Sequence, residues 1–464
     1  MSTPRKIIKR LIWALLLCFI IYLLACLLIP PIIGTRRKSD AALTLPTPAA
    51  ERVCLIDDND DALLWRLRLI SSAQEEIILS TFDLRADNSG TDIIAALLDA
   101  AERGVQVRLI VDGVNAQLHL NGSDSFKALA AHENVQVKLY NPLRLTRLWT
   151  VNYRCHDKYL IVDRSAYLMG GRNTSDLFLG SGGTVRQNAD RDLLVYGDAS
   201  PDASVNSLLD YFDGIWALDT NRDFRANAEK RSLKTAAAAL NERWAEIAAE
   251  GNISPIAWEN ETIPARGVSV LSGDCRAWNK EPKLLNTLAM LMSGGKENAL
   301  LQSPYVICNK AMYAALARAA GGDAELQIIT NAPQTGANPW GCADYLNEQG
   351  KLLASGATVC EWTGEHSMHT KTILIDDSIS IIGSFNWDMR SAYLDTEMML
   401  LVDCPELNAA LREETDAMIS ESKIVSPDGS ISEGAEYIAP EISPLKTALQ
   451  ALLRVLIRPF RYLL

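Results

Sequence analysis

The chain has 464 residues, so it is long enough for two or more domains that each bury a core of their own. Apolar residues make up 48% of it and charged residues 22%, which excludes wholesale disorder. The formal net charge of −12 argues against a protein that works along nucleic acid, because such proteins usually present a basic face to the phosphates. The nine cysteines form no CxxC pair, so neither a zinc cluster nor a disulfide framework is indicated.

The first element in chain order is an apolar run at the N-terminus. Residues Leu11 to Ile29 carry no charge, and about 20 such residues cross the hydrocarbon core of a bilayer. The tetrapeptide LLAC ending at Cys26 weakly resembles a lipoprotein cleavage box, but the residues after Cys26 stay strongly apolar. This favours an uncleaved, single-pass anchor over residues 1–33 of a cell-membrane protein. Four basic residues precede the run and three follow it, which favours a catalytic part on the outer side.

A polar, proline-containing tether is expected over residues 34–52, and a duplicated pattern of helices and strands follows it. The helical patterns of the two halves lie at 61–73 and 91–103, then at 282–292 and 309–320. The strand patterns lie at 76–83 and 105–112, then at 298–306 and 325–330. Strands that alternate with helices indicate βαβ units and sheets covered by helices.

We therefore expect an α/β fold in which two duplicated α/β/α halves pack into one bilobal catalytic unit, with an N-terminal transmembrane helix. The first half is expected at 53–255 and the second at 256–425. The first half has a helical extension at 206–252, which is rich in alanine, tryptophan and charge. The joint between the halves is expected at 255–266.

Residues 426–464 are expected to form a linker and a basic amphipathic helix. Polar residues recur there every three or four positions, which places them on one helical face with leucines and Ile457 on the other. These polar residues are Lys446, Gln450, Arg454, Arg458 and Arg461. The favoured interpretation is a helix that lies in the headgroup layer of an anionic membrane. The alternative is a helix packed on its own domain with its arginines solvated.

Two copies of one histidine motif carry the chemistry. His156 heads the first copy and His369 the second, and the chain has only five histidines. In both copies a lysine, an aspartate and an asparagine follow the histidine by two, seven and seventeen residues. These residues are Lys158, Asp163 and Asn173 in the first copy, and Lys371, Asp376 and Asn386 in the second. Chance does not account for four polar positions that agree twice.

The spacing predicts that these side chains meet at one rim. Residues two apart in a strand point to the same face, so each histidine projects together with its lysine. Gly170, Gly171 and Gly383 fit turns that bring the asparagines back to this rim. The set supplies a nucleophile, an acid/base partner and a cationic, hydrogen-bonding cradle for a tetrahedral phosphate. The lysines can supply the positive charge, so no metal and no cofactor is expected.

Further carboxylates support the motif. Asp192 and Glu397 each precede an apolar run, and we expect them to accept a hydrogen bond from a histidine Nδ1–H, which makes Nε2 the reactive nitrogen. The motif aspartates Asp163 and Asp376 belong to the same catalytic motif, but they are expected to brace the strand ends rather than to touch phosphate. Arg172 and Ser384 lie between a glycine and the motif asparagine, where either a ligand contact or a structural role is open.

The paired HxKx4D motif followed by GxxN resembles the phospholipase D superfamily, and accessory segments resemble its bacterial cardiolipin synthase branch. These segments are MGGRN at 169–173, YFDGIW at 211–216, SPYV at 303–306, GSFNWDMRS at 383–391 and DTEMMLLV at 395–402. The resemblance covers about residues 53–425 and implies phospholipase D-like halves. It also implies a two-step reaction through a covalent phosphohistidine. By analogy His156 is the nucleophile and His369 the acid/base. The stretch at 336–350, where acceptor contacts are expected, does not match the branch.

The function that this resemblance implies is phosphatidyl transfer onto the glycerol hydroxyl of phosphatidylglycerol. The partners would be phosphatidylglycerol, a second phospholipid as donor, and the membrane, with no nucleic acid. One alternative is a hydrolase that uses the same site with water as acceptor, either a phospholipase D or a nuclease. The other is a membrane scaffold without activity, which two intact motifs argue against.

Overall fold

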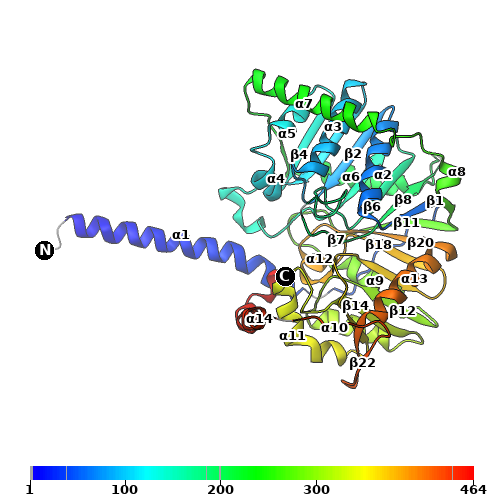
Figure 1. The fold of residues 1–464 in the computed structure, drawn as a ribbon. Coiled ribbons are helices and arrows are strands. Elements are labelled where there is room, and N and C mark those ends of the chain that lie inside the picture. The colour runs from blue at the N-terminus through cyan, green and yellow to red at the C-terminus, as the bar shows by residue number, and fades with distance from the viewer. Residues whose placement is uncertain (1–3, 38, 184, 198–199, 442) are drawn as a thin grey trace.

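The computed structural model describes residues 4–37, 39–183, 185–197, 200–441 and 443–464. Helix α1 (Pro4–Gly34) projects from a bilobal unit in which each lobe is built on one nine-stranded sheet (Figure 1). This helix is long and apolar enough to cross a membrane, and almost all of it lies outside the body of the protein. The expected combination of two α/β halves and one N-terminal apolar helix is confirmed.

The sheet of the first half has its strands in the order β10 (Ile263–Pro264), β1 (Arg52–Ile56), β8 (Asp192–Tyr196), β6 (Ala166–Gly170), β5 (Tyr159–Val162), β2 (Glu76–Thr81), β3 (Gln106–Asp112), β4 (Val135–Tyr140) and β9 (Arg222–Asp223). Its helices are α2 (Asn59–Ser72), α3 (Asn88–Glu102), α4 (Gly113–His119), α5 (Asp124–Ala130), η1 (Leu145–Thr150), α6 (Ser204–Trp216), α7 (Lys230–Ala249) and α8 (Trp258–Glu261).

The sheet of the second half runs β11 (Gly267–Ser272), β20 (Met398–Asp403), β18 (Ile379–Gly383), β17 (Thr372–Ile375), β12 (Asn298–Gln302), β14 (Glu325–Asn331), β15 (Thr358–Trp362), β21 (Ser422–Val425) and β22 (Ile431–Glu433). Its helices are α9 (Lys283–Ser293), α10 (Lys310–Ala320), α11 (Pro339–Leu353), α12 (Met389–Tyr393), α13 (Pro405–Ser420), α14 (Pro444–Ile457) and η2 (Arg461–Leu463). Two short ladders pair β13 (Val306–Ile307) with β19 (Trp387–Asp388), and β7 (Asn188–Ala189) with β16 (Ser367–Met368).

The strand orders confirm the duplication. The sequence β1-β8-β6-β5-β2-β3-β4 in the first sheet matches β11-β20-β18-β17-β12-β14-β15 in the second, strand for strand. In both halves the predicted βαβ units form parallel pairs, β2 with β3 and β12 with β14. Both motif hairpins, β5–β6 and β17–β18, are antiparallel and central. The two histidine motifs therefore occupy equivalent positions in the two sheets.

Two details of the predicted division differ. Strand β10 pairs with β1, so the sheet of the first half reaches Pro264, beyond the expected boundary at 255. The expected helical extension is also not continuous, because β9 joins the edge of the sheet between α6 and α7. Helix α7 covers α3 and α5, whereas α6 lies against β11 of the second half. The segment between β8 and β10 thus packs against both halves.

The expected tether is bound along the second half. Ala49 exchanges two backbone hydrogen bonds with Val268 at 3.0 and 2.7 Å. The amide of Leu43 donates to Thr287 Oγ1 at 2.8 Å, and the side chain of Asn286 donates to two carbonyls of the segment. A polar composition predicts an extended chain but not whether a surface binds it. The predicted linker is therefore an extended segment that lies on the second half.

Helix α14 is amphipathic as predicted, but its polar face points toward the protein. Gln450 donates to the carbonyl of Pro333 at 2.5 Å, and Arg454 donates to Asn347 Oδ1 at 3.0 Å. Arg461, just beyond the helix, makes two hydrogen bonds of 2.9 Å to the buried carboxylate of Asp344. The helix therefore packs on its own domain, as the alternative expects, and Arg454 and Arg458 stay exposed to solvent, although Arg454 also contacts the protein. Helical periodicity separates two faces without showing which one meets the protein.

The central strands divide the first half between two hydrophobic cores. Tyr159 and Ile161 of β5 point into a core that both halves share. Leu160 and Val162, on the other face of β5, point into a core formed by the first half alone, under α2, α3 and α5. The shared core means that the two sheets fold against each other as one body, with the N-terminal ends of β5 and β17 close to the junction.

The motif aspartates end the central strands, as expected. Both adopt a positive φ, 47° at Asp163 and 48° at Asp376. The carboxylate of Asp163 accepts the amides of residues 74, 75 and 76 at 2.8, 2.8 and 2.9 Å. Asp376 accepts the equivalent amides of residues 296, 297 and 298. Each aspartate therefore ties the motif strand to the start of its neighbour, β2 or β12.

Replacement of either aspartate should destabilise the protein without removing a catalytic group. Asp163→Ala and Asp376→Ala each leave three amides without their carboxylate, so we expect a loss of about 2 kcal/mol in the free energy of unfolding. Denaturant unfolding measures this loss, and activity per folded molecule should stay near that of the wild type. Asp377→Ala, at the exposed neighbour, is the control. A stable but inactive Asp163→Ala protein would instead give the carboxylate a direct role in the chemistry.

Candidate active site

His156 is held by a carboxylate from the other half. Its Nδ1 lies 2.9 Å from Glu397 Oε1, and its backbone amide donates to Thr396 Oγ1 at 3.0 Å. The amide of Thr396 in turn donates to the carbonyl of Arg154 at 2.9 Å. Hydrogen bonds between the segment 154–156 and Thr396 thus hold Glu397, the next residue, beside the imidazole of His156. An oxygen that receives the Nδ1–H leaves the Nε2 lone pair free.

His369 shows the same arrangement with the halves exchanged. Its Nδ1 lies 2.5 Å from Asp190 Oδ2 of the first half. Its backbone amide donates to the carbonyl of Ala189 at 2.7 Å, at the end of the ladder between β16 and β7. Each half therefore supplies one imidazole and the carboxylate that orients the imidazole of the other. The two motifs build one site rather than two.

The assignment of Asp192 as a histidine partner is wrong. Asp192 is fully buried and forms ion pairs with Arg66 at 2.9 Å and with Arg172 at 3.3 Å. The sequence held the correct signal, since the run LLV occurs at 193–195 and again at 400–402. Asp190 and Glu397 both lie three residues before it. The strand pairings agree, because Gly170 lies opposite Asp192 and Gly383 lies opposite Met399.

Both motif lysines fold back beside their histidines. Lys158 Nζ donates to the carbonyl of His156 at 2.5 Å. Lys371 Nζ donates to the carbonyl of His369 and lies 2.7 Å from its Nδ1. Phe82 and Phe178 pack against the two rings, with centroids 5.0 and 4.9 Å from those of His156 and His369. Sequence reasoning did not find these phenylalanines, because no pattern marks an aromatic residue that lies against a distant ring.

The glycines of the motif allow residues of the neighbouring strand to approach closely. A Cβ on Gly171 would lie 2.2 Å from Asp190 Oδ1, and one on Gly383 would lie 2.2 Å from the carbonyl of Met398. The asparagines that follow are buried, and their Oδ1 atoms have no hydrogen-bond partner among the described residues. Asn386 Nδ2 donates to Tyr305 Oη at 3.2 Å. The side-chain amides of the two asparagines are thus among the polar groups that a ligand at this rim could contact.

The two open positions beside the asparagines have structural roles. The guanidinium of Arg172 donates to the carbonyl of Ile56 at 2.9 Å and also contacts Asp57 and Asp192. Ser384 Oγ donates to Glu397 Oε2, and Ser391 Oγ donates to Glu397 Oε1 at 2.6 Å. The serines therefore orient the carboxylate that orients His156.

The electrostatics of the two pairs differ. Burial raises the pKa of Glu397 to about 8, with the nearby charge of Lys158 opposing the rise. Burial also acts on Asp190, but Lys371 and His369 outweigh it and hold its pKa down to about 2. Burial together with Lys371 lowers the pKa of His369 to about 4. At neutral pH the His369 pair therefore contains a carboxylate ion, whereas Glu397 is largely protonated.

The cationic groups act across the junction. Burial and Lys158 lower the pKa of His156 well below its usual value, and Lys371 of the other half adds to this. Burial, with Lys158 adding, lowers the pKa of Lys371 to about 7. The lysines and the imidazoles are thus close enough to feel one another's charge. Among the residues that the structure describes, no group of three or more His, Cys, Asp or Glu side chains is placed to hold a metal ion.

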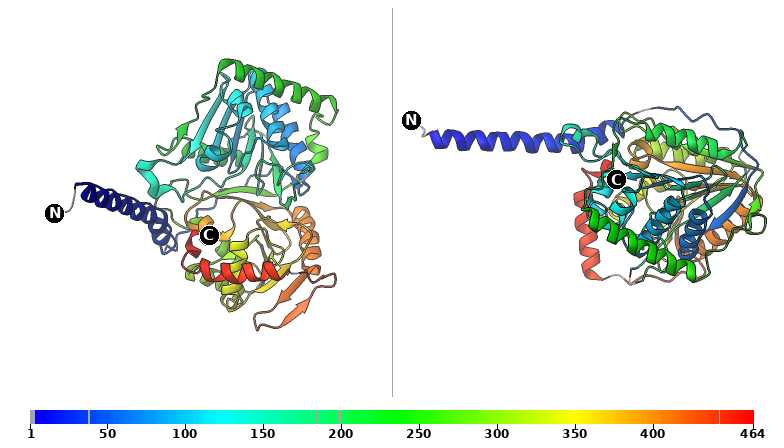
Figure 2. Two further views of the ribbon diagram at one scale, coloured as in Figure 1. Left: turned by 60° about the vertical axis from the view of Figure 1, so that its left-hand side comes forward. Right: turned by 90° about the horizontal axis from the view of Figure 1, so that it is seen from above.

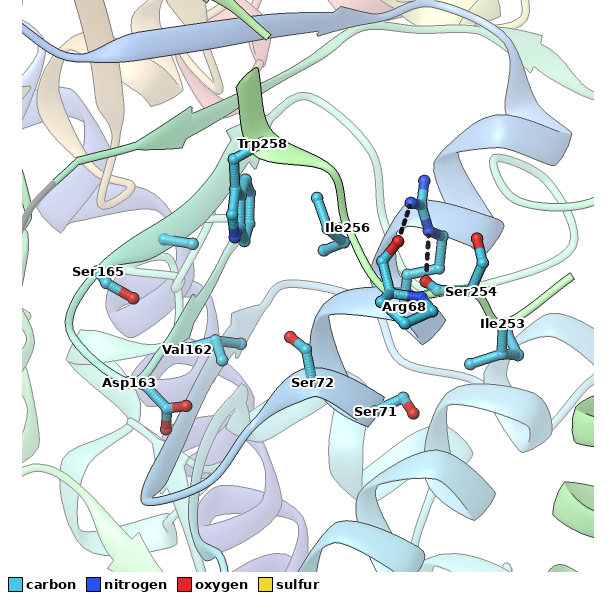
Figure 3. Close-up of a pocket in the computed structure, with 12 residues that line it drawn as sticks. Arg68, Ser71, Ser72, Val162, Asp163, Ser165, Ile253, Ser254, Ile256 and Trp258 are labelled. Atoms are coloured by element: carbon cyan, nitrogen blue, oxygen red, sulfur yellow. Dashed lines mark hydrogen bonds between the residues drawn. The ribbon is translucent and has the colours of Figure 1, made fainter. Parts of the chain in front are cut away.

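A separate pocket of about 410 Å³ lies at the far end of β5 (Figure 3). Asp163 is the one motif residue that lines it, and Arg68 there donates to the carbonyls of residues 254 and 255. Asp163 follows His156 by seven residues, most of them in the strand, so about 20 Å of chain separates this pocket from the imidazoles. The pocket is distinct from the histidine site.

Comparison with known proteins matches both halves. The family model described as "Cardiolipin synthase, PLD-like domain" matches residues 67–216 and 288–419, which contain both histidine motifs. An uncharacterised protein of Helicobacter pylori is 27% identical over 415 residues, which cover 79% of this chain and 78% of that protein. Cardiolipin synthase C of Escherichia coli is 26% identical over 396 residues, with 75% and 80% covered.

A solved structure has the same fold. The crystal structure of a phosphatidylserine synthase from Haemophilus influenzae superposes with a TM-score of 0.63. It covers 90% of this chain and 97% of its own, at 16% sequence identity. At that identity the match speaks for the fold alone, and it extends over both halves.

The crossed pairs predict opposite effects for two neighbouring aspartates. Asp190→Asn keeps the shape of the side chain but removes the charge that sets the His369 tautomer, so we expect kcat to fall by about 100-fold or more with little change in stability. Asp192→Asn breaks a buried ion-pair cluster, so we expect a loss of about 3–5 kcal/mol in unfolding free energy. Steady-state kinetics and denaturant unfolding separate the two. If Asp192→Asn were the inactive, stable variant, the assignment would be reversed.

Proposed function

Because the chain belongs to the cardiolipin synthase, phospholipase D-like domain family, we propose that it is a phosphatidyltransferase that makes cardiolipin. It moves a phosphatidyl group onto the glycerol hydroxyl of phosphatidylglycerol through a phosphohistidine. The observation that carries the proposal is the crossed arrangement of His156–Glu397 and His369–Asp190, which joins both motifs in one site. The match to Escherichia coli cardiolipin synthase C along most of both chains supports the choice of lipid.

In the first step, Nε2 of His156 attacks the phosphorus of the donor phospholipid. A P–N bond forms as the bond from phosphorus to the leaving alcohol breaks, and His369 gives its Nε2 proton to that alcohol. Lys158, Lys371 and the amides of Asn173 and Asn386 neutralise and hold the phosphate oxygens. The incoming phosphate also raises the pKa of His369, since a nearby negative charge favours the imidazolium that this step requires.

In the second step, the glycerol hydroxyl of phosphatidylglycerol replaces the departed alcohol. Nε2 of His369, now neutral, takes the hydroxyl proton as the oxygen attacks phosphorus and the P–N bond breaks. His156 leaves as a neutral imidazole with its Nδ1–H still donated to Glu397. Both steps use the same pair of rings, with the role of His369 exchanged from acid to base.

The assignment of His156 as nucleophile is supported by the difference between the carboxylates. Asp190 is ionised, and a negative charge 2.5 Å from the ring favours a proton on His369. Glu397 is largely neutral at pH 7, so it favours a proton on His156 less and leaves that ring as the free base. A nucleophile needs the lone pair, and an acid needs the proton.

Hydrolysis by the same site is the alternative function. Water in place of the acceptor alcohol would give phosphatidic acid, or a cut strand if the substrate were nucleic acid. The acidic chain and the apolar helix α1 support lipid over nucleic acid. The excess of basic residues before the apolar run over those after it supports a catalytic unit on the outer side of the membrane.

Lipid mass spectrometry of cells that express the chain tests the proposal. Wild type should raise cardiolipin, whereas His156→Ala and His369→Ala should not, because each removes one half of the relay. His366→Ala, at an exposed histidine outside the motifs, is the matched control and should behave as wild type. A rise in phosphatidic acid without cardiolipin would show a hydrolase, and equal lipid profiles in all strains would refute the activity.

The pKa of Lys371 predicts that kcat/KM falls above neutral pH and that the variant Lys371→Arg does not show this fall. Below about pH 7 its ammonium is protonated and binds phosphate, and above that it loses the charge. For the wild type, kcat/KM should therefore fall by up to about tenfold per pH unit above neutrality, since this ratio reports the free enzyme. Lys371→Arg keeps its charge at every accessible pH and should remove the fall, whatever its absolute activity. An unchanged descending limb in this variant would assign the limit to another group.

A further inference from the structure

Two exposed apolar surfaces flank helix α1. The first, the tip patch, consists of Leu143, Leu145 and Trp149 on the loop that contains η1. The second, the α14 patch, is the outward face of that helix. Its exposed members are Leu445, Leu449, Leu452, Val455 and Leu456, together with Phe460 just beyond the end of the helix. Figure 1 shows that α14 and the loop with η1 lie on the side of the catalytic unit from which α1 leaves.

The tip patch reaches along the membrane-spanning helix. Asn152 donates to the carbonyl of Leu27 at 2.8 Å, and Tyr22 Oη donates to the carbonyl of Leu145 at 3.4 Å. Tyr22 lies seven residues before Ile29, the end of the uncharged run, which is about 10 Å along a helix. A bilayer that surrounds the uncharged run of α1 therefore also surrounds Leu145. Its side chain is 72% exposed.

The two arginines of the tip loop, Arg144 and Arg147, point away from the exposed side chain of Leu145. Arg144 donates to the carbonyls of Thr220 and Asn221 at 2.5 and 3.3 Å. Arg147 pairs with Asp219 at 3.1 Å. The loop thus turns its guanidinium groups toward the protein and its leucines and tryptophan outward. In water this arrangement exposes apolar surface, whereas in a bilayer it buries that surface.

Helix α14 repeats the same arrangement. Its inward face holds Gln450, Arg454 and the buried Leu453 and Ile457. Successive residues of a helix are rotated by 100°, so the side of α14 opposite this inward face carries alanine, leucine and valine and no charged residue. Val455 on this face is 65% exposed. Monomeric proteins rarely leave such a face in water, and helices of this kind lie flat in the boundary between headgroups and acyl chains.

The position of α14 fits that boundary. Its end is fixed beside the end of α1, because η2 contacts α1. Burial raises the pKa of Tyr462 in η2, and the nearby charge of Arg36 opposes the rise. In the right-hand view of Figure 2, α14 runs across the direction of α1 rather than along it. If α1 crosses the bilayer, a helix perpendicular to α1 lies parallel to the membrane surface. Helix α14 lies at the end of α1, where the basic residues Arg36 and Arg37 follow the apolar run.

We propose that the catalytic unit docks on the lipid bilayer through both surfaces. The tip patch inserts among the acyl chains beside α1, and the α14 patch lies at the boundary of headgroups and chains. Two contacts beside a spanning helix fix the height and the rotation of the unit, which a single helix leaves free. The occupant of both patches is the bilayer itself.

Spin labels on the full-length protein in liposomes test this docking. Single cysteines replace Leu145 and Val455 in a background where the exposed Cys18 is replaced by serine. Ile431→Cys is the matched control, an apolar residue of β22 that is 64% exposed and far from α1. Molecular oxygen collects in hydrocarbon, whereas a nickel chelate stays in water. At 145 and 455 we expect the oxygen collision rate to exceed the nickel rate, and the reverse at 431. Nickel-dominated collisions at 145 or at 455 would overturn the two-contact docking.

A kinetic measurement adds a second test that rests on the proposed function. The double variant Leu145→Glu/Val455→Glu loses two apolar insertions, so we expect the KM for lipid in vesicles to rise about tenfold or more. Activity on a short-chain, monomeric phospholipid should be unchanged, because neither residue belongs to the site. An equal loss on both substrates would overturn the interpretation as membrane docking. The spin-label result does not depend on activity, so failure of the docking and failure of the proposed function are distinguishable.

Discussion

Each imidazole of the site is oriented by a carboxylate that belongs to the other half of the chain, Glu397 for His156 and Asp190 for His369. A buried histidine without such a partner would lose its preferred tautomer, and the buried carboxylate would lose one of its hydrogen-bond donors. Neither half can therefore form its part of the site alone. The shared hydrophobic core and the ladder between β7 and β16 keep the halves in the register that these contacts require.

The duplication gives nearly equal geometry but unequal chemistry. Both rings receive a carboxylate at Nδ1, a lysine two residues on and a packed phenylalanine. The difference lies in the acids: the shorter Asp190 stays ionised beside Lys371, whereas burial protonates the longer Glu397 between Ser384 and Ser391. A two-step transfer needs one ring that holds a proton and one that does not. The two halves have the same fold but carry different acids at equivalent positions, Asp190 and Glu397, and this provides the difference.

The features of the site that could be predicted from the sequence are those formed within a single half. The spacing from His156 to Lys158 and Asp163 places all three, because a strand has a fixed period and its end needs a brace. Contacts between halves leave no such pattern, so the crossing of the carboxylates was not predicted. Asp190 was within reach, since it lies three residues before LLV as Glu397 does, but the apolar run beside Asp192 gave a stronger local signal. For α14, periodicity separated the faces without showing which one meets the protein.

Chain connectivity links the proposed docking to the proposed chemistry. From Trp149 in the tip patch to His156 the chain has seven residues, which span at most about 25 Å. On the other side, Arg390 of α12 follows Asn386 by four residues and binds the carbonyls of Leu463 and Leu464, beyond α14. Both contacts with the bilayer thus lead directly into segments that carry site residues. A phospholipid phosphate lies at the membrane surface, where its acyl chains hold it. An enzyme fixed at that height can reach the phosphorus while the chains stay in the bilayer, so it avoids the cost of extracting two apolar tails into water.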